Sequence, residues 1–268
     1  MQVTRRDALK IVPVAAVAGI VLDARPANAA PAALDLPATY PTQDPSLAKE
    51  MVGASHGNDT KVRELLSQYP ALVNAAWDWG FGDWETALGA ASHTGQREIA
   101  QRLIDGGARP DIFSFAMLGH VDVIRAYVAA RPGIQRIRGP HGITLLKHAK
   151  AGGDAAASVV EYLTQLGDAD IAYINETLTE AQIDALSGDY RVEGSADVFV
   201  VSKSKSNDVM IKRGATGTPR MLFHQGKQIF HPAGAPTVRI KFESDNGSVR
   251  TMIVEDGPIS LRATCNAK

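Results

Sequence analysis

The most informative stretch of the sequence is Thr86–Asp111, which reads TALGAASHTGQREIAQRLIDGGARPD. Thr86 stands where a helix N-cap is expected, because its hydroxyl can accept a bond from the first turn. Gly95 separates two runs of helical periodicity, and Gly107 suits a left-handed turn that begins the next unit. The stretch therefore predicts two short helices, each of which needs a neighbouring helix to pack against.

This stretch resembles an ankyrin repeat, and the same frame recurs around three more turn glycines, Gly57, Gly119 and Gly153. Successive turn glycines, with Gly95 included, are 38, 24 and 34 residues apart, whereas a regular array repeats about every 33 residues. No predicted first helix carries the histidine of the family's Thr-Pro-Leu-His opening. The resemblance implies an α-helical ankyrin-repeat solenoid of about four degenerate repeats over residues 46–175.

The sequence changes character in its last third, where short runs of β-forming residues alternate with turn residues. Asn246-Gly247 between two such runs predicts a hairpin. The opening Leu186–Tyr190 and a Gly-rich hairpin are similar to small β-domains appended to serine β-lactamase-like hydrolases. We expect a linker helix at 176–186 and a small antiparallel β-barrel or sandwich at 187–268, which makes the fold class α+β with two domains.

The first 29 residues predict an export signal. Arg5 and Arg6 precede the 12-residue apolar run Ile11–Leu22, which is shorter than the roughly 20 residues that span a bilayer. The alternative is an uncleaved anchor helix. The segment resembles a twin-arginine signal, and the resemblance implies a periplasmic protein with no membrane attachment after cleavage. An Ala/Pro-rich leader is expected over residues 30–45.

Composition excludes several classes of protein. The chain has 268 residues, of which 45% are hydrophobic and 21% charged, as in soluble globular proteins. Lys and Arg number 28 against 29 Asp and Glu, a net charge of −1, so no nucleic-acid partner is expected. The single cysteine, Cys265, cannot form an internal disulfide, and we interpret it as an unreactive residue near the chain end.

Motifs of catalysis are absent from the sequence. There is no G-x-S-x-G elbow, no H-E-x-x-H pair and no phosphate loop ending in Gly-Lys-Ser/Thr. We interpret Asp78, Asp83 and Glu85 as solvated loop acids, because nothing nearby would separate their protonation behaviour. The sequence therefore predicts a protein that is not an enzyme and that needs no cofactor.

Three histidines fall beside the inter-helix turns of successive predicted repeats: His56, His93 and His120. We interpret them as packing residues and assign no metal site, because a zinc site needs a third or fourth well-placed ligand. The alternative is a row of imidazoles along one edge of the stack that binds a metal ion.

All three tryptophans of the protein fall in one eight-residue stretch, Trp77–Trp84. Aromatic residues in a projecting loop are typical of binding hot spots, so we expect Trp77, Trp79, Phe81 and Trp84 to bind a partner. The alternative is a buried hydrophobic cluster.

Taken together, these features predict a periplasmic protein-interaction module. It would bind an unidentified periplasmic protein through the ankyrin concave face and the Trp-rich loop. The alternative function is a small-ligand carrier that binds its ligand in the C-terminal β-domain.

Overall fold

The computed structural model describes residues 40–245 and 248–265. From Thr42 onward the chain groups into one compact unit. The predicted export signal, with Arg5 and Arg6, and the leader up to residue 39 lie outside the described residues.

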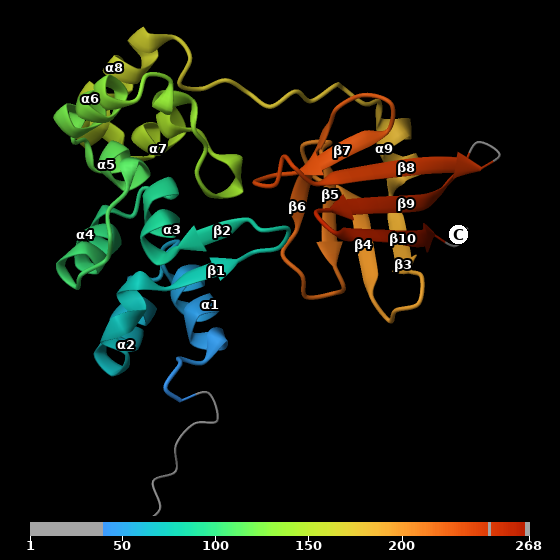
Figure 1. Cartoon of the computed structure of the whole chain (residues 1–268), viewed down its shortest axis with the longest axis horizontal. Helices are drawn as coiled ribbons and strands as arrows, with labels where there is room; N and C mark the ends of the chain where they lie inside the picture. Colours follow the sequence, from blue (N-terminus) through green and yellow to red (C-terminus); the bar gives the residue numbers. More distant parts are fainter. Residues whose placement is uncertain (1–39, 246–247, 266–268) are drawn as a thin grey trace, which may run out of the picture. The chain divides into compact units, whose positions relative to one another are not determined.

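Short helices occupy the described chain up to Leu166, and none is longer than ten residues (Figure 1). They are α1 (Pro45–Ala54), α2 (Asp59–Gln68), α3 (Ala87–His93), α4 (Arg97–Asp105), α5 (Ile112–Leu118), α6 (Val121–Ala130), α7 (Leu145–Ala151) and α8 (Ala157–Leu166). Side chains cap several of them: Thr86 and Thr144 accept the first-turn bonds of α3 and α7, as expected. The cap of α1 is Asp44, which accepts a bond from the backbone of Ser46.

The segments that join these helices differ in kind. The antiparallel hairpin of β1 (Ala76–Asp78) and β2 (Trp84–Thr86) separates α2 from α3. Four 3-10 turns interrupt the described chain elsewhere: Pro70–Asn74, Ile134–Arg136, Pro140–Gly142 and Gly153–Ala156.

The predicted ankyrin-repeat solenoid is wrong, and with it the predicted fold class. A solenoid stacks like units around one continuous core. Here the helices pack around two separate clusters of buried apolar residues, one that runs from Met51 to Met117 and one that runs from Ile112 to Ala169. Because the helices surround two cores and unlike segments join them, they are not shown to form a repeat solenoid.

The last third of the chain is a closed antiparallel barrel of eight strands (Figure 1). The strands are β3 (Gly188–Val192), β4 (Val198–Lys203), β5 (Val209–Arg213), β6 (Arg220–His224), β7 (Ile229–Pro232), β8 (Arg239–Asp245), β9 (Ser248–Asp256) and β10 (Ile259–Cys265). Each strand pairs with the next one along the chain, and β10 pairs with β3, which closes the sheet. Because the sheet is closed, the structure is a barrel and not a sandwich, the other possibility considered from the sequence.

The barrel core follows from alternation along its strands. Ile240 and Phe242 of β8 are buried, whereas Arg239 and Lys241, which alternate with them, are exposed. Helix α9 (Glu180–Leu186) adds Ile183 and Leu186 to the same cluster. Strands β8 and β9 pair on either side of the predicted Asn246-Gly247 turn, which itself lies outside the described residues.

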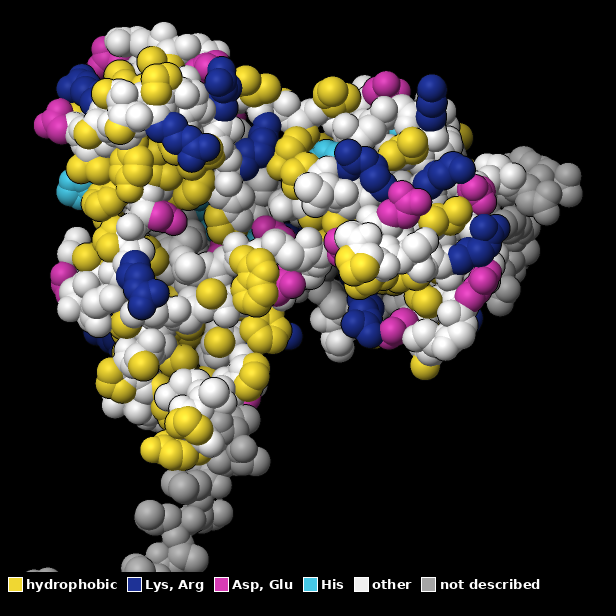
Figure 2. All heavy atoms as spheres, in the orientation of Figure 1, with side chains coloured by type: hydrophobic (Ala, Val, Ile, Leu, Met, Phe, Trp, Pro, Cys, Tyr) yellow, Lys and Arg dark blue, Asp and Glu magenta, His cyan; other side chains and the backbone are white. Residues whose placement is uncertain are grey.

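On the face seen in Figure 2, acidic and basic side chains are interspersed, and neither charge forms a large patch of its own. Among the described residues, no helix is both long and apolar enough to cross a membrane.

Candidate metal centre

In the β1–β2 hairpin, the side chains of Asp83, Trp84 and Glu85 point alternately to the buried and the exposed face. Successive residues of an extended strand point to opposite faces. Trp84 therefore points outward and is 64% exposed, whereas Asp83 and Glu85 point inward and are 3% and 1% exposed. The hairpin register pairs Glu85 with Trp77, which fixes the carboxylate on the buried face. Two buried acids in one short hairpin need partners, because an unpaired buried charge is costly.

Three histidines from separate segments surround Glu85. His56 follows α1, His93 ends α3, and His141 lies in the 3-10 turn Pro140–Gly142. Their Nε2 atoms lie 3.4, 2.9 and 3.4 Å, respectively, from the Glu85 carboxylate oxygens. One ligand atom from each of the four residues lies within 4.8 Å of the other three.

The three separations between the histidine nitrogens and Glu85 fit a metal ion. Ligands bonded at about 2.0–2.1 Å to a tetrahedral ion lie roughly 3.3 Å from one another. Glu85 Oε1 and His93 Nε2 are buried and have no hydrogen-bond partner among the described residues, although they lie 2.9 Å apart. Two buried polar atoms that converge without forming a hydrogen bond are the arrangement that a shared cation satisfies.

Outer contacts set which nitrogen of two histidines is free. His56 Nδ1 lies 3.0 Å from the Val52 carbonyl oxygen, which can only accept, so the ring proton sits on Nδ1 and leaves the Nε2 lone pair open. His141 Nδ1 lies 2.7 Å from Asp83 Oδ2, so Nε2 is the nitrogen that faces Glu85. Acceptors of this kind behind a histidine are the usual support of metal ligands.

Two further contacts hold the carboxylates in place. The Trp79 indole N–H donates to Glu85 Oε2 at 2.6 Å. The His141 backbone N–H donates to Asp83 Oδ1 at 2.9 Å, and Asp83 also forms a buried ion pair with Arg220 of β6, whose Nη1 lies 2.9 Å from His141 Nδ1. His141 adopts a φ of 59°, in the left-handed region that non-glycine residues rarely occupy. Backbone strain of this kind gathers at functional sites.

The electrostatics keep the carboxylate ionised. Burial acts to raise the pKa of Glu85, but contacts with His141 and His93 outweigh it and lower that pKa to about 2. Burial likewise acts to lower the pKa of His141, whereas the contacts with the Asp83 and Glu85 carboxylates raise it to about 9. The metal-free cluster therefore holds a proton on His141 in the position that a cation would take.

The expected partner-binding residues fall into different environments. Trp77 and Trp79 are half-buried and pack against the first apolar cluster of the helices. Phe81 stacks on Phe199 with ring centroids 6.4 Å apart. Trp84 alone of the four is largely exposed.

The metal alternative of the sequence analysis named a different set of histidines. His56 and His93 belong to the cluster, whereas His120 is exposed and contacts Phe115 instead. His141 was missed because it lies outside the inter-helix turns, and Glu85 because its stretch was interpreted as a solvated loop. The alternation Asp83-Trp84-Glu85 after a glycine turn was the available signal for a strand with acids on one face.

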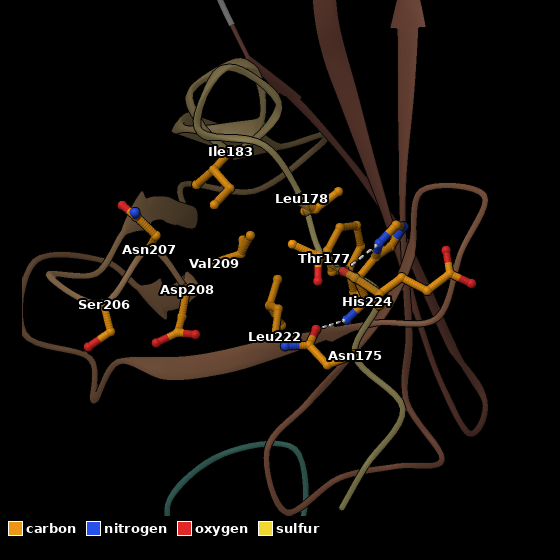
Figure 3. A pocket seen from close by; sticks show the side chains of 12 residues that line it. Asn175, Thr177, Leu178, Ile183, Ser206, Asn207, Asp208, Val209, Leu222 and His224 are labelled. Carbon is orange, nitrogen blue, oxygen red and sulfur yellow. Dashed lines mark hydrogen bonds between the residues drawn. The ribbon is translucent and has the colours of Figure 1, made fainter.

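A pocket separate from this cluster lies at one end of the barrel, next to the segment that leads into α9 (Figure 3). Its volume is about 360 Å³, and Ser206, Asn207 and Asp208 line one side of it opposite His224. The His224 backbone N–H donates to Asn175 Oδ1 at 2.9 Å, while His224 Nε2 is buried without a partner in the described chain. This pocket offers one unpaired nitrogen and no convergent ligand set.

Comparison with known proteins finds no family model that matches this chain and no curated protein that matches it.

Proposed function

We propose that the protein binds one divalent transition-metal ion through His56, Glu85, His93 and His141. The observation that carries this proposal is the convergence of three histidine Nε2 atoms on the buried Glu85 carboxylate. Within this group, Glu85 Oε1 and His93 Nε2 have no hydrogen-bond partner among the described residues. Three imidazoles and one carboxylate suit Zn²⁺ and its neighbours in the first transition series. Mg²⁺ and Ca²⁺ prefer sites made of oxygen ligands.

The site is open on one side. The side chains of His56 and His141 are 31% and 24% exposed, whereas that of Glu85 is fully buried. An ion can therefore enter past the two histidines and exchange with solvent, while Glu85 and His93 form the floor of the site.

The experiment is zinc titration of the full chain after treatment with a chelator, by calorimetry and by metal analysis of the desalted protein. One equivalent of Zn²⁺ is expected to bind. Glu85→Gln, which keeps the shape but removes the charge, and His56→Ala, at a partly exposed position, should each weaken binding by about tenfold or more, since even outer-contact changes have effects of that size.

His120→Ala is the matched control, because His120 is exposed and lies outside the cluster. Its zinc affinity should equal that of the unmodified protein. Failure of the unmodified protein to retain zinc, or an equal loss in His120→Ala and His56→Ala, would overturn the proposal.

We further propose, as a second function, that the outer face of the β1–β2 hairpin binds a protein partner. Trp84 supports this because a tryptophan that is 64% exposed offers a large rigid contact surface. The periplasmic location and the identity of the partner stay predictions.

Trp84→Ala tests this second function. Cross-linking in intact cells that express the full chain, followed by mass spectrometry, should recover a partner with the unmodified protein and lose it with Trp84→Ala. Tyr127→Ala, at another exposed aromatic residue, should retain it. An unchanged set of cross-linked proteins in Trp84→Ala would show that the hairpin face is not the contact.

A further inference from the structure

A cavity of about 390 Å³ is lined in part by Trp79 and Arg220, which also contact Glu85 and Asp83 at the proposed metal centre. Its lining is largely apolar: the turn of the β1–β2 hairpin supplies Trp79 and Phe81, and the barrel strands supply Phe199 and Ile211. Apolar cavities of this size with a few polar groups are the usual form of small-molecule sites.

Arg220 is the polar group of greatest interest in this lining. It is 5% exposed, and its Nη1 edge is occupied by Asp83 and His141. Its Nε and Nη2 groups are buried and have no hydrogen-bond partner among the described residues. These two N–H groups have lost water without gaining a partner, a cost that a ligand with a matching acceptor removes.

Nε and Nη2 form the side of a guanidinium that binds one carboxylate with two bonds. Other arginines of the same chain show this use. Nε and Nη2 of Arg213 lie 3.1 and 2.8 Å from Asp197 Oδ1, and those of Arg102 contact Asp59 in the same way. In Arg220 the same edge faces no carboxylate of the described chain.

The charged side chains in the rest of the lining are compatible with a bound anion, because the lining has more basic than acidic residues. Lys49 and Lys212 are the other cations there besides Arg213, which is already paired with Asp197. Two acids also line the cavity, and one of them, Asp78, accepts a bond from the Gly80 backbone at 2.8 Å.

We propose that this cavity binds an amphiphilic monocarboxylate, with its apolar body against the aromatic residues and its carboxylate on Nε and Nη2 of Arg220. The site is separate from the metal centre and does not depend on a bound ion. It gives the small-ligand function a position at one end of the barrel core, because Phe199, Ile211 and Val254 of the lining belong to that core and Phe81 of the hairpin turn packs against it.

The probes are decanoate, decanol and acetate, titrated into the full chain by calorimetry in the presence of a chelator, so that a metal ion cannot hold the carboxylate. Decanoate should bind with one site per chain. Decanol, which has the apolar body without the charge, should bind about tenfold more weakly or worse, and acetate should not bind measurably. Decanol that binds as tightly as decanoate would overturn the role of Arg220.

Arg220→Lys keeps the charge beside Asp83 but removes the two-pronged edge. It should reduce the preference for decanoate over decanol by about tenfold, while decanol binding stays unchanged and shows that the cavity is intact. An unchanged preference would contradict the proposal.

A second pair of variants avoids the buried network. Ile259 lines the cavity and is exposed, so it tolerates charge. Ile259→Asp should weaken decanoate binding, and Ile259→Lys should leave it equal or tighter. Ile174→Asp, at an exposed isoleucine away from this lining, is the control and should have no effect. Equal loss in Ile259→Asp and Ile174→Asp would also overturn the proposal.

Discussion

Glu85 is ionised at a depth where an isolated carboxylate would be costly, so its neighbours must supply the compensation. They do so unequally. Trp79 donates one hydrogen bond to Oε2, whereas Oε1 has only histidine nitrogens within reach and no bond from them. One oxygen of Glu85 therefore accepts a hydrogen bond, whereas the other accepts none from the described residues. A single cation bound at Oε1 completes its environment.

Proton release should accompany metal binding, because His141 must be neutral to bind through Nε2. With its pKa raised to about 9, His141 is protonated in the metal-free protein near neutral pH, whereas Glu85, with a pKa of about 2, has no proton to lose. The apparent zinc association constant should therefore rise about tenfold per pH unit from pH 7 toward pH 9 and then level. Calorimetry in buffers of different ionisation enthalpy measures the proton directly.

An association constant that stays flat from about pH 7 to pH 9 would show that His141 is not a ligand, or that its proton is already absent. His141→Gln is the matched variant. It should bind zinc more weakly and release one proton fewer than the unmodified protein.

At the scale of elements, the parts that depend on local sequence could be predicted. The cap at Thr86 and the β-strands of the last third were predicted, because hydroxyl caps and runs of β-forming residues act within a few positions. The hairpin β1–β2 was missed, since glycines and tryptophans in one short stretch are equally typical of an irregular loop.

What could not be predicted depends on distant partners. Closure of the sheet depends on the pairing of β10 with β3, and no local pattern in the sequence shows that pairing. The candidate metal centre is similar in this respect: His56 and His93 lie beside turns that the sequence suggests, but their convergence with Glu85 and His141 depends on tertiary packing. The ankyrin resemblance led to a solenoid that the structure does not show, because the resemblance rests on short local runs and carries no information on how the helices pack.

At the scale of the whole molecule, one buried ion pair joins the hairpin to the barrel. Asp83 precedes β2 and Arg220 begins β6, and both side chains are almost inaccessible to water. Burial acts to raise the pKa of Asp83, but bonds from His141 and the charge of Arg220 outweigh it and hold that pKa below its usual range. The pair therefore links segments far apart in the sequence within one compact unit.

Asp83→Asn should lower the free energy of unfolding by about 3–5 kcal/mol, because it leaves the buried Arg220 charge without its partner. Urea unfolding of the metal-free full chain, followed by circular dichroism, measures the change. Asp197→Asn, which breaks the exposed pair with Arg213, is the control and should alter the unfolding midpoint little. Equal effects of the two variants would mean that the buried pair contributes no more than a surface contact.

The hydrogen bond from Trp79 to Glu85 has an optical consequence. The fluorescence of an indole ring responds to changes in charge and hydrogen bonding at its N–H group. The Trp79 N–H group donates to the Glu85 carboxylate, which is also a ligand of the proposed ion. The chain holds three tryptophans, so replacing the exposed Trp84 by Phe leaves a signal that comes from the two half-buried ones. Occupancy of the centre could then be followed by intrinsic fluorescence, without any dye or label.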